Sequence, residues 1–258
     1  MAAPAGPLRI YLAGHVALER GDVLVPERRL PGRQGRLVFA LLAAERGEAL
    51  SNDGVADIVW NGAPPRAWDT ALRAIMSKLR GVMAEAGLDD AVAIESAFGC
   101  YQLRLPADTW IDLEAAGEAV HHAETELRAG NLAAANGEAL IAAAIARRPF
   151  LAGDDGEWVE QRRSMLHDVR VRALSCRAEV ALAVGEPALA VGDAELVIEL
   201  DPYREATYVL LMRAHVAAGS RAQALQTYER LRSLMADELG ASPSPASEAV
   251  YLEILRMR

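Results

Sequence analysis

Residues 8–31 alternate hydrophobic with polar positions, a pattern typical of short strands that bury one face. Gly14 and the Gly21-Asp22 pair interrupt the alternation, where turns between strands are expected. In residues 32–47 the hydrophobic positions become dense enough for a buried helix that ends at a glycine. The pattern therefore predicts a small antiparallel sheet followed by a helix.

Two further helices and a hairpin complete the N-terminal part. Ser51 is a suitable N-cap for a second helix that reaches Trp60. A third helix is expected over residues 66–86, and residues 91–106 read as two β-rich stretches joined by a turn around 96–99. Strands, three helices and a terminal hairpin predict an α+β winged helix-turn-helix with a small N-terminal sheet.

The third predicted helix has a basic face opposite a hydrophobic one, because residues three, four and seven apart share a helix face. The hydrophobic face consists of Leu72, Ile75, Met76 and Leu79. The other face offers guanidinium, hydroxyl and ammonium groups, which a helix in the DNA major groove requires. The candidate DNA-binding residues are Arg66, Thr70, Arg73, Ser77, Lys78 and Arg80.

Within this set, Arg73 and Ser77 are expected to face the groove, since Arg can bind guanine with two hydrogen bonds and Ser can reach bases or phosphates. Lys78 and Arg80 are expected towards the DNA backbone, and Arg66 near a phosphate. Each arginine taken alone could equally be a solvated surface residue, so the prediction concerns the cluster.

Aromatic residues flank the basic helix. Trp60 is expected in the core. For Trp68 the core is favoured over a phosphate-flanking or a polymerase-facing position. Phe98 and Tyr101 fall at the predicted hairpin turn, where they could enter the minor groove as a wing. The favoured interpretation is that both close the hairpin.

Strand signals end at residue 112, and helices follow one another from there. We therefore expect a boundary between domains 1–108 and 109–258. The second domain contains a repeat, because Gly185 and Gly219 are 34 residues apart, as are Ala190 and Ala224. This period predicts an all-α tetratricopeptide-like helical repeat domain, although coincidence in an alanine-rich chain is the alternative. An earlier, weaker copy lies around residues 130–135 and is followed by an irregular stretch.

Charge is distributed unevenly between these two parts. The chain carries a net charge of −9, which argues against a generally basic nucleic-acid-binding protein. Residues 1–110 hold 12 basic and 13 acidic residues, so nearly all the excess acid belongs to the C-terminal part. Because phosphate responds to charge within about 10 Å at moderate salt, a neutral domain with one basic face can still bind DNA.

Motifs for other chemistry are missing from the sequence. Cys100 and Cys176 are far apart and are expected to be buried free thiols, and the histidines have no metal-ligand spacing, so neither a metal nor a cofactor is expected. No nucleotide-binding or nucleophile-elbow motif supports an enzyme. The acidic residues 154–157 lie beside glycines and read as a solvated connector. Without a signal sequence or an apolar span, a cytoplasmic location away from membranes is expected.

Several segments resemble the SARP-type (Streptomyces antibiotic regulatory protein) transcriptional activators. RQGRLVFALLA (33–43), LRAIMSKLR (72–80) and the Gly99 to Leu103 stretch look like the DNA-binding half of that family. RRPFLAG (147–153) and above all ALQTYERLRSLMADELGASPSPA (224–246) look like its activation domain.

The resemblance implies an OmpR-like winged helix joined to a bacterial transcriptional activation domain. It implies double-stranded DNA with direct promoter repeats and RNA polymerase subunits as partners, and a possible homodimer on DNA. The wing departs from the family pattern, since Cys100 stands where the family usually runs directly from Gly to Tyr. No forkhead-associated or nucleotidase sensor region is expected, because none follows Arg258. A helical-repeat adaptor whose winged helix no longer binds DNA is the alternative function.

Overall fold

The computed structural model describes residues 6–257 and divides into two compact units. The first unit comprises Met1–Ala115 together with Ile145–Leu166, and the second comprises Ala116–Ala144 with His167–Arg258. The chain therefore leaves the first unit, enters the second, returns and leaves again. We call residues 145–166 the return segment. The sequence-based division at residue 108 remains a prediction.

The first unit begins with the expected small sheet. Strands β1 (Leu8–Tyr11), β2 (Ala17–Arg20) and β3 (Val23–Val25) are antiparallel neighbours, and β7 (Trp110–Ile111) adds to β1 in parallel. The predicted glycine turns separate the strands. The alternation of buried and exposed positions along β1 matches the sequence pattern.

Three helices pack in the winged-helix part of the first unit: α1 (Gly32–Ala44), α2 (Asn52–Val59) and α3 (Trp68–Glu85). Ser51 caps α2 as predicted, because its side chain accepts a hydrogen bond from the Gly54 amide at 3.1 Å. The core includes side chains that are at most 1% exposed: Leu8, Ile10, Leu12, Phe39, Leu41, Leu42, Leu72, Met76 and Leu79. Each such aliphatic or aromatic side chain contributes about 1.5–3 kcal/mol to folding.

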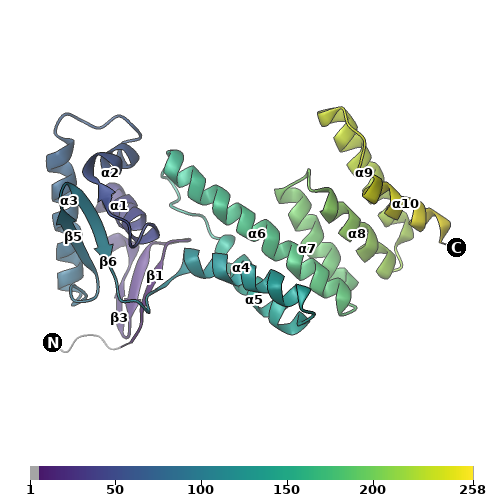
Figure 1. Cartoon of the computed structure of the whole chain (residues 1–258), viewed down its shortest axis with the longest axis horizontal. Coiled ribbons are helices and arrows are strands. Elements are labelled where there is room, and N and C mark those ends of the chain that lie inside the picture. The colour runs from purple at the N-terminus through teal and green to yellow at the C-terminus, as the bar shows by residue number, and fades with distance from the viewer. Residues whose placement is uncertain (1–5, 258) are drawn as a thin grey trace. The chain divides into compact units, whose positions relative to one another are not determined.

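A second sheet of three strands forms the wing, in the order β4 (Leu50–Ser51), β6 (Cys100–Arg104) and β5 (Ala93–Ala97). The β5–β6 hairpin and α3 lie side by side (Figure 1). Both cysteines are free thiols, but only Cys176 is buried, and the expectation for Cys100 was wrong because the start of β6 is partly open to solvent.

The return segment joins the first unit through its backbone. Phe150 forms an antiparallel bridge with Ala13, and the Gly14 amide donates to the Pro149 carbonyl at 2.8 Å. Asp154 is 1% exposed and accepts hydrogen bonds from Arg33 and Arg36. The expectation of a solvated connector was therefore wrong for Asp154, because two arginines that are more than a hundred residues away in sequence compensate its burial.

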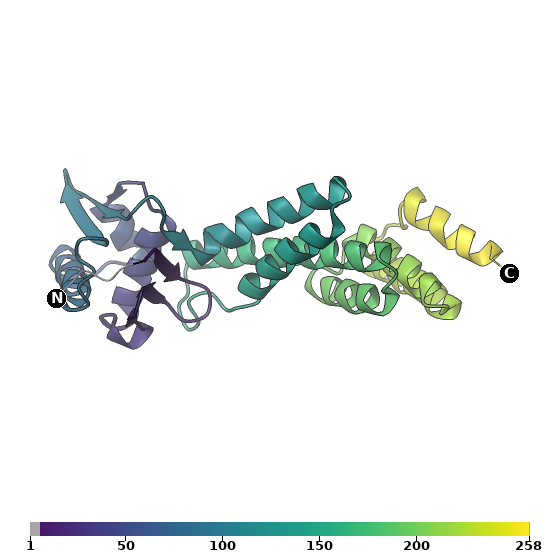
Figure 2. The ribbon, with the colours of Figure 1, turned by 90° about the horizontal axis from the view of Figure 1, so that it is seen from below.

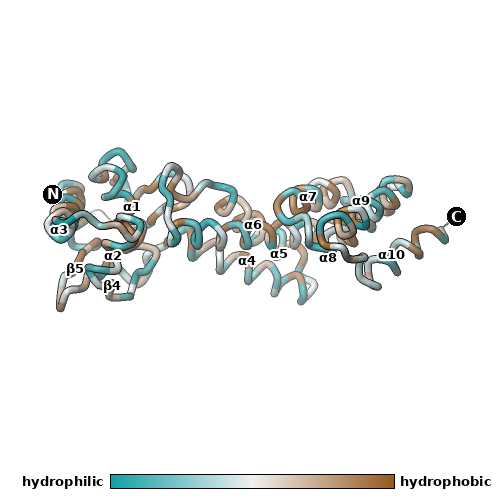
Figure 3. Tube along the Cα trace, turned by 90° about the horizontal axis from the view of Figure 1, so that it is seen from above, coloured by the Kyte–Doolittle hydropathy of each residue, from teal (hydrophilic) through white to brown (hydrophobic). Residues whose placement is uncertain are grey.

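The second unit is built from helices that pair in antiparallel fashion. They are α4 (Asp112–Arg128), α5 (Leu132–Ala146), α6 (Glu157–Ala183), α7 (Pro187–Leu200), α8 (Glu205–Ala217), α9 (Arg221–Leu239) and α10 (Pro245–Arg256), of which α4, α5 and α6 begin or end in the first unit. The teal helices α4 and α5 run alongside each other in Figure 2. Hydrophobic and polar positions are interspersed along these helices (Figure 3).

The predicted repeat is present three times. Gly130, Gly185 and Gly219 each adopt a left-handed conformation, with φ of 80°, 80° and 74°. In each turn the residue after the glycine donates its amide to the carbonyl five positions earlier, the bond that defines a Schellman motif. The alanine five positions after each glycine, at 135, 190 and 224, is fully buried between helices. The turn of the weaker first copy thus has the same geometry as the other two, although it lies 55 residues before the second turn rather than 34.

None of the helices within residues 6–257 has a stretch both long and apolar enough to cross a membrane.

Candidate nucleic-acid interface

Helix α3 separates its two faces as the sequence predicted. Leu72, Met76 and Leu79 are fully buried, and Ile75 is 8% exposed. All six candidate residues lie on the exposed side or just before the helix: Arg66, Thr70, Arg73, Ser77, Lys78 and Arg80. Trp60 and Trp68 are half-buried rather than core residues. The structure therefore brings the candidates together on an open surface, and their contacts with DNA stay a prediction.

Arg73 forms an ion pair on this surface. Its guanidinium lies 2.9 Å from the Asp69 carboxylate one helical turn earlier, and the two side chains are 69% and 43% exposed. An exposed pair of this kind contributes about 0–1 kcal/mol and weakens with salt. A phosphate or a guanine edge can therefore displace Asp69 at small cost.

Arg80 braces the wing against α3. Its Nε and one terminal nitrogen donate to the Ile94 carbonyl on β5, at 3.0 and 2.8 Å. The guanidinium keeps its other terminal nitrogen for a ligand, so Arg80 can position the wing and still contact a phosphate. Lys78 and Arg66, in contrast, form no ion pair among the residues that the structure describes.

The wing ends in a two-residue turn made by Phe98 and Gly99. Both have positive φ, at 51° and 74°, between paired Ala97 and Cys100, which is the pattern of a type I′ hairpin. Phe98 is fully exposed, so the expectation that it closes the hairpin was wrong. Tyr101 is 4% exposed and does close the hairpin, because it pairs with Leu50 of β4. The turn points the Phe98 side chain outwards, which the sequence pattern could not show.

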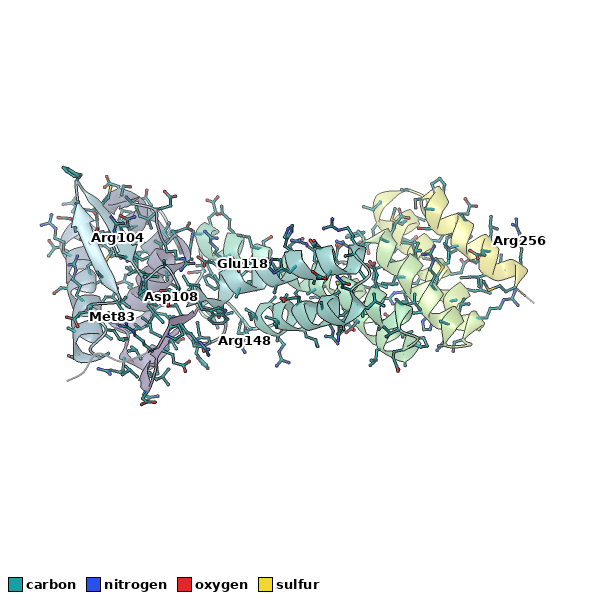
Figure 4. All side chains as sticks on the ribbon, turned by 60° about the horizontal axis from the view of Figure 1, so that its bottom comes forward. Met83, Arg104, Asp108, Glu118, Arg148 and Arg256 are labelled. Atoms are coloured by element: carbon teal, nitrogen blue, oxygen red, sulfur yellow. The ribbon has the colours of Figure 1, made fainter. Side chains whose placement is uncertain are left out.

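Arg104 is a basic wing residue that the sequence reasoning missed. It lies on β6 (Figure 4), is 60% exposed and pairs with Glu95 of the neighbouring strand at 3.0 Å. Arg104 is the last residue of its strand, so the pattern of hydrophobic and polar positions did not mark it as a DNA-binding candidate. Within the described part of the chain, no group of three histidine, cysteine or acidic residues is arranged to hold a metal ion.

A small ionic cluster supports the other side of the first unit. Arg36 pairs with Asp154 and, at 2.9 Å, with Glu27, whose other carboxylate oxygen accepts the Val16 amide. Burial opposes the charge on Arg36, but the hydrogen bonds to both carboxylates outweigh it and raise the pKa of Arg36. The cluster anchors α1 to Glu27 and to the return segment.

Comparisons with known proteins give a consistent result. A family model described as "Bacterial transcriptional activator domain" matches residues 111–255. The chain is 28% identical over 229 residues to the transcriptional regulatory protein EmbR of Mycobacterium tuberculosis, which covers 86% of this chain and 58% of EmbR. It is 31% identical over 253 residues to the regulatory protein AfsR of Streptomyces coelicolor. This alignment covers 98% of the present chain and 24% of AfsR.

A solved structure is similar over nearly the whole chain. It is M. tuberculosis EmbR in complex with a low-affinity phosphopeptide, with a TM-score of 0.83 and 26% identity over 96% of this chain and 65% of that one. The present chain thus spans 58% of EmbR and about a quarter of AfsR in sequence.

Proposed function

Because this chain belongs to the SARP-type transcriptional regulators, which carry a bacterial transcriptional activator domain, we propose that it activates transcription by binding promoter DNA through α3 and the wing. The observation that carries the proposal is the exposed row of basic and hydroxyl side chains on α3, next to the fully exposed tip of the β5–β6 hairpin. A helix in the major groove and a hairpin reaching the neighbouring groove together make a winged-helix interface.

Five of the six candidates divide between two roles in this proposal. Arg73 and Ser77 read base edges in the major groove, where Arg favours guanine. Lys78, Arg80 and Arg66 neutralise phosphates and fix the register of the helix on the duplex. Since the N-terminal part is nearly neutral overall, non-specific affinity is weak, and specificity depends on these local contacts.

The test is a salt titration of DNA binding by the Arg73→Ala/Lys78→Ala variant, on a duplex from the upstream region of the chain's own gene. A groove contact is worth about 1–3 kcal/mol, and losing a phosphate contact lowers the salt slope by about 1. Arg28→Ala is the matched control, because Arg28 is exposed, forms no ion pair among the described residues and lies outside α3 and the wing. If the double variant binds as the parent does at every salt concentration, α3 is not the DNA-binding face.

We also propose that the helical unit recruits RNA polymerase. Its support is the match of residues 111–255 to the activator family and the excess of acidic residues there, which suits a basic protein surface. Transcription in vitro with purified bacterial RNA polymerase should rise with the whole chain. If the whole chain binds the promoter but does not raise transcription, the recruitment proposal is refuted.

A repeat-based adaptor is the second candidate function, favoured by the near-neutral N-terminal part and by the Asp69–Arg73 pair on α3. A salt-sensitive gel shift on the upstream duplex eliminates it.

A further inference from the structure

The return segment is anchored to α1 by buried charge. The Asp154 carboxylate, 1% exposed, accepts hydrogen bonds from Arg33 and Arg36, and Arg36 also donates to the Ala152 carbonyl at 3.0 Å. Arg163 adds hydrogen bonds to the backbone carbonyls of Leu151 and Asp154, each at 2.9 Å. The conformation of residues 150–154 is therefore held from both sides.

The next residue, Asp155, extends from this anchor to the turn after α2. One of its carboxylate oxygens accepts a hydrogen bond from the Arg33 guanidinium at 2.9 Å and another from the side-chain nitrogen (Nδ2) of Asn61 at 3.3 Å. The backbone of Gly156 also lies against Asn61, since a Cβ placed on Gly156 would overlap the Asn61 side-chain oxygen. Asn61 is thus held by a hydrogen bond on one side and by close packing on the other.

Asn61 occupies the point where the chain turns from α2 towards α3. It has a φ of 50°, in the left-handed region that Asn tolerates better than most residues. The amide of Gly62 closes the turn by donating to the Asp57 carbonyl at 2.8 Å. Arg66 follows four residues later, and α3 begins at Trp68. The turn at Asn61 therefore sets the direction in which the chain runs towards the basic helix.

Few other contacts join the two segments. A cavity of about 580 Å³ lies between them, lined on one side by the end of α2 and on the other by residues 155–161. In the part of the chain that the structure describes, one side-chain hydrogen bond, Asn61–Asp155, crosses this cavity between residues 52–67 and the return segment. That bond and the packing of Gly156 against Asn61 therefore hold the turn after α2 at its distance from the return segment.

We propose that Asp155 is a positioning residue for DNA recognition: from its anchor on α1 it holds Asn61, and thereby fixes how α3 presents its first turns to the groove. The inference rests on the proposed DNA binding. It gives the return segment, which belongs to the matched activator region, a direct influence on the winged helix.

The test compares two carboxylates that lie two residues apart in the full chain. Asp155→Ala removes the hold on Asn61, while Glu157→Ala removes the same charge from a residue whose side chain bonds Gln161 within α6. The probe is the same upstream duplex, followed by fluorescence anisotropy across a salt titration. Because one hydrogen bond contributes about 0.5–1.5 kcal/mol, Asp155→Ala should raise Kd about 2- to 12-fold.

Two readouts separate positioning from stability or charge. The salt slope of Asp155→Ala should equal that of the parent, because no phosphate contact is lost, and its urea midpoint should stay close to that of the parent, because the side chain is 77% exposed. Asn61→Gly, which accepts the same backbone conformation and cuts the same bond from the other end, should weaken binding as much. The double variant should be no weaker than either single one.

Equal affinities of Asp155→Ala and Glu157→Ala, or additive effects of Asp155→Ala and Asn61→Gly, would overturn the inference. If the folded parent itself does not bind the duplex, the proposed function fails. If the parent binds and only the variant comparison fails, the positioning role alone is refuted.

Discussion

The buried carboxylate of Asp154 attaches the return segment to α1 through Arg33 and Arg36. Asp154→Ala leaves Arg33 and Arg36 without their common acceptor. Removing one partner of a fully buried pair costs about 3–5 kcal/mol. Here Arg36 keeps Glu27, and Arg33 is 60% exposed and keeps Asp155, so solvent and remaining partners reduce the loss to about 2–3 kcal/mol.

The tryptophans make the measurement selective. All four, at positions 60, 68, 110 and 158, belong to the first unit, so tryptophan fluorescence follows its unfolding without a signal from the second. With a urea m-value of about 2 kcal/mol/M, the expected loss lowers the midpoint by about 1–1.5 M. Glu160→Ala, which removes a 61% exposed carboxylate paired with Arg163, should change stability by about 0.5 kcal/mol or less. Equal midpoints for Asp154→Ala and Glu160→Ala would refute the argument that buried charge secures the segment.

Three further predictions concern other parts of the chain. The two hydrogen bonds from Arg172 hold the pKa of Glu124 below its usual 4.5, so their contribution is complete above pH 4.5 and is lost as the pH falls through the lowered value. Glu124→Gln should therefore melt earlier than the parent at pH 7, by circular dichroism, and the difference should shrink below pH 4.5; a constant difference would contradict the pairing. Phe98→Ala should leave the urea midpoint unchanged, because the side chain is fully exposed, but should weaken DNA binding in anisotropy; unchanged affinity would remove the wing tip from the interface. Gly185→Ala should cost about 1–2 kcal/mol in thermal melting because φ is 80° there, whereas Gly137→Ala, inside α5 with open space around it, should gain about 0.5–1 kcal/mol. Shifts of the same sign would show that backbone conformation does not decide the outcome.

Local patterns were enough to predict most elements of the fold. The 3.6-residue spacing on α3, the Ser51 cap and the glycines of the repeat depend on neighbours within a few positions, and the structure contains each of them. Burial could then be inferred for Leu72 and Leu79, since an amphipathic helix has only one face to bury.

The remaining features depend on distant partners or on turn geometry. Asp154 lies in a glycine-rich acidic stretch, and nothing nearby indicates that Arg33 will meet it across 121 residues. Phe98 is hydrophobic, so burial was the natural expectation, yet a two-residue turn leaves its tip side chain no core to enter. Sequence periodicity describes faces of single elements, whereas these two residues depend on the assembled unit.

Because the chain returns to the first unit at residues 145–166, the order of synthesis on the ribosome affects how this unit folds. Domains generally fold from the N-terminus as they emerge, but this one stays incomplete until residue 166 has been made, more than fifty residues after its last strand. During that interval Arg33 and Arg36 on α1 lack Asp154, the acceptor that they share. Chimeras that exchange the winged-helix half between relatives should therefore carry the 145–166 stretch with it, or the grafted half will fold without its anchor.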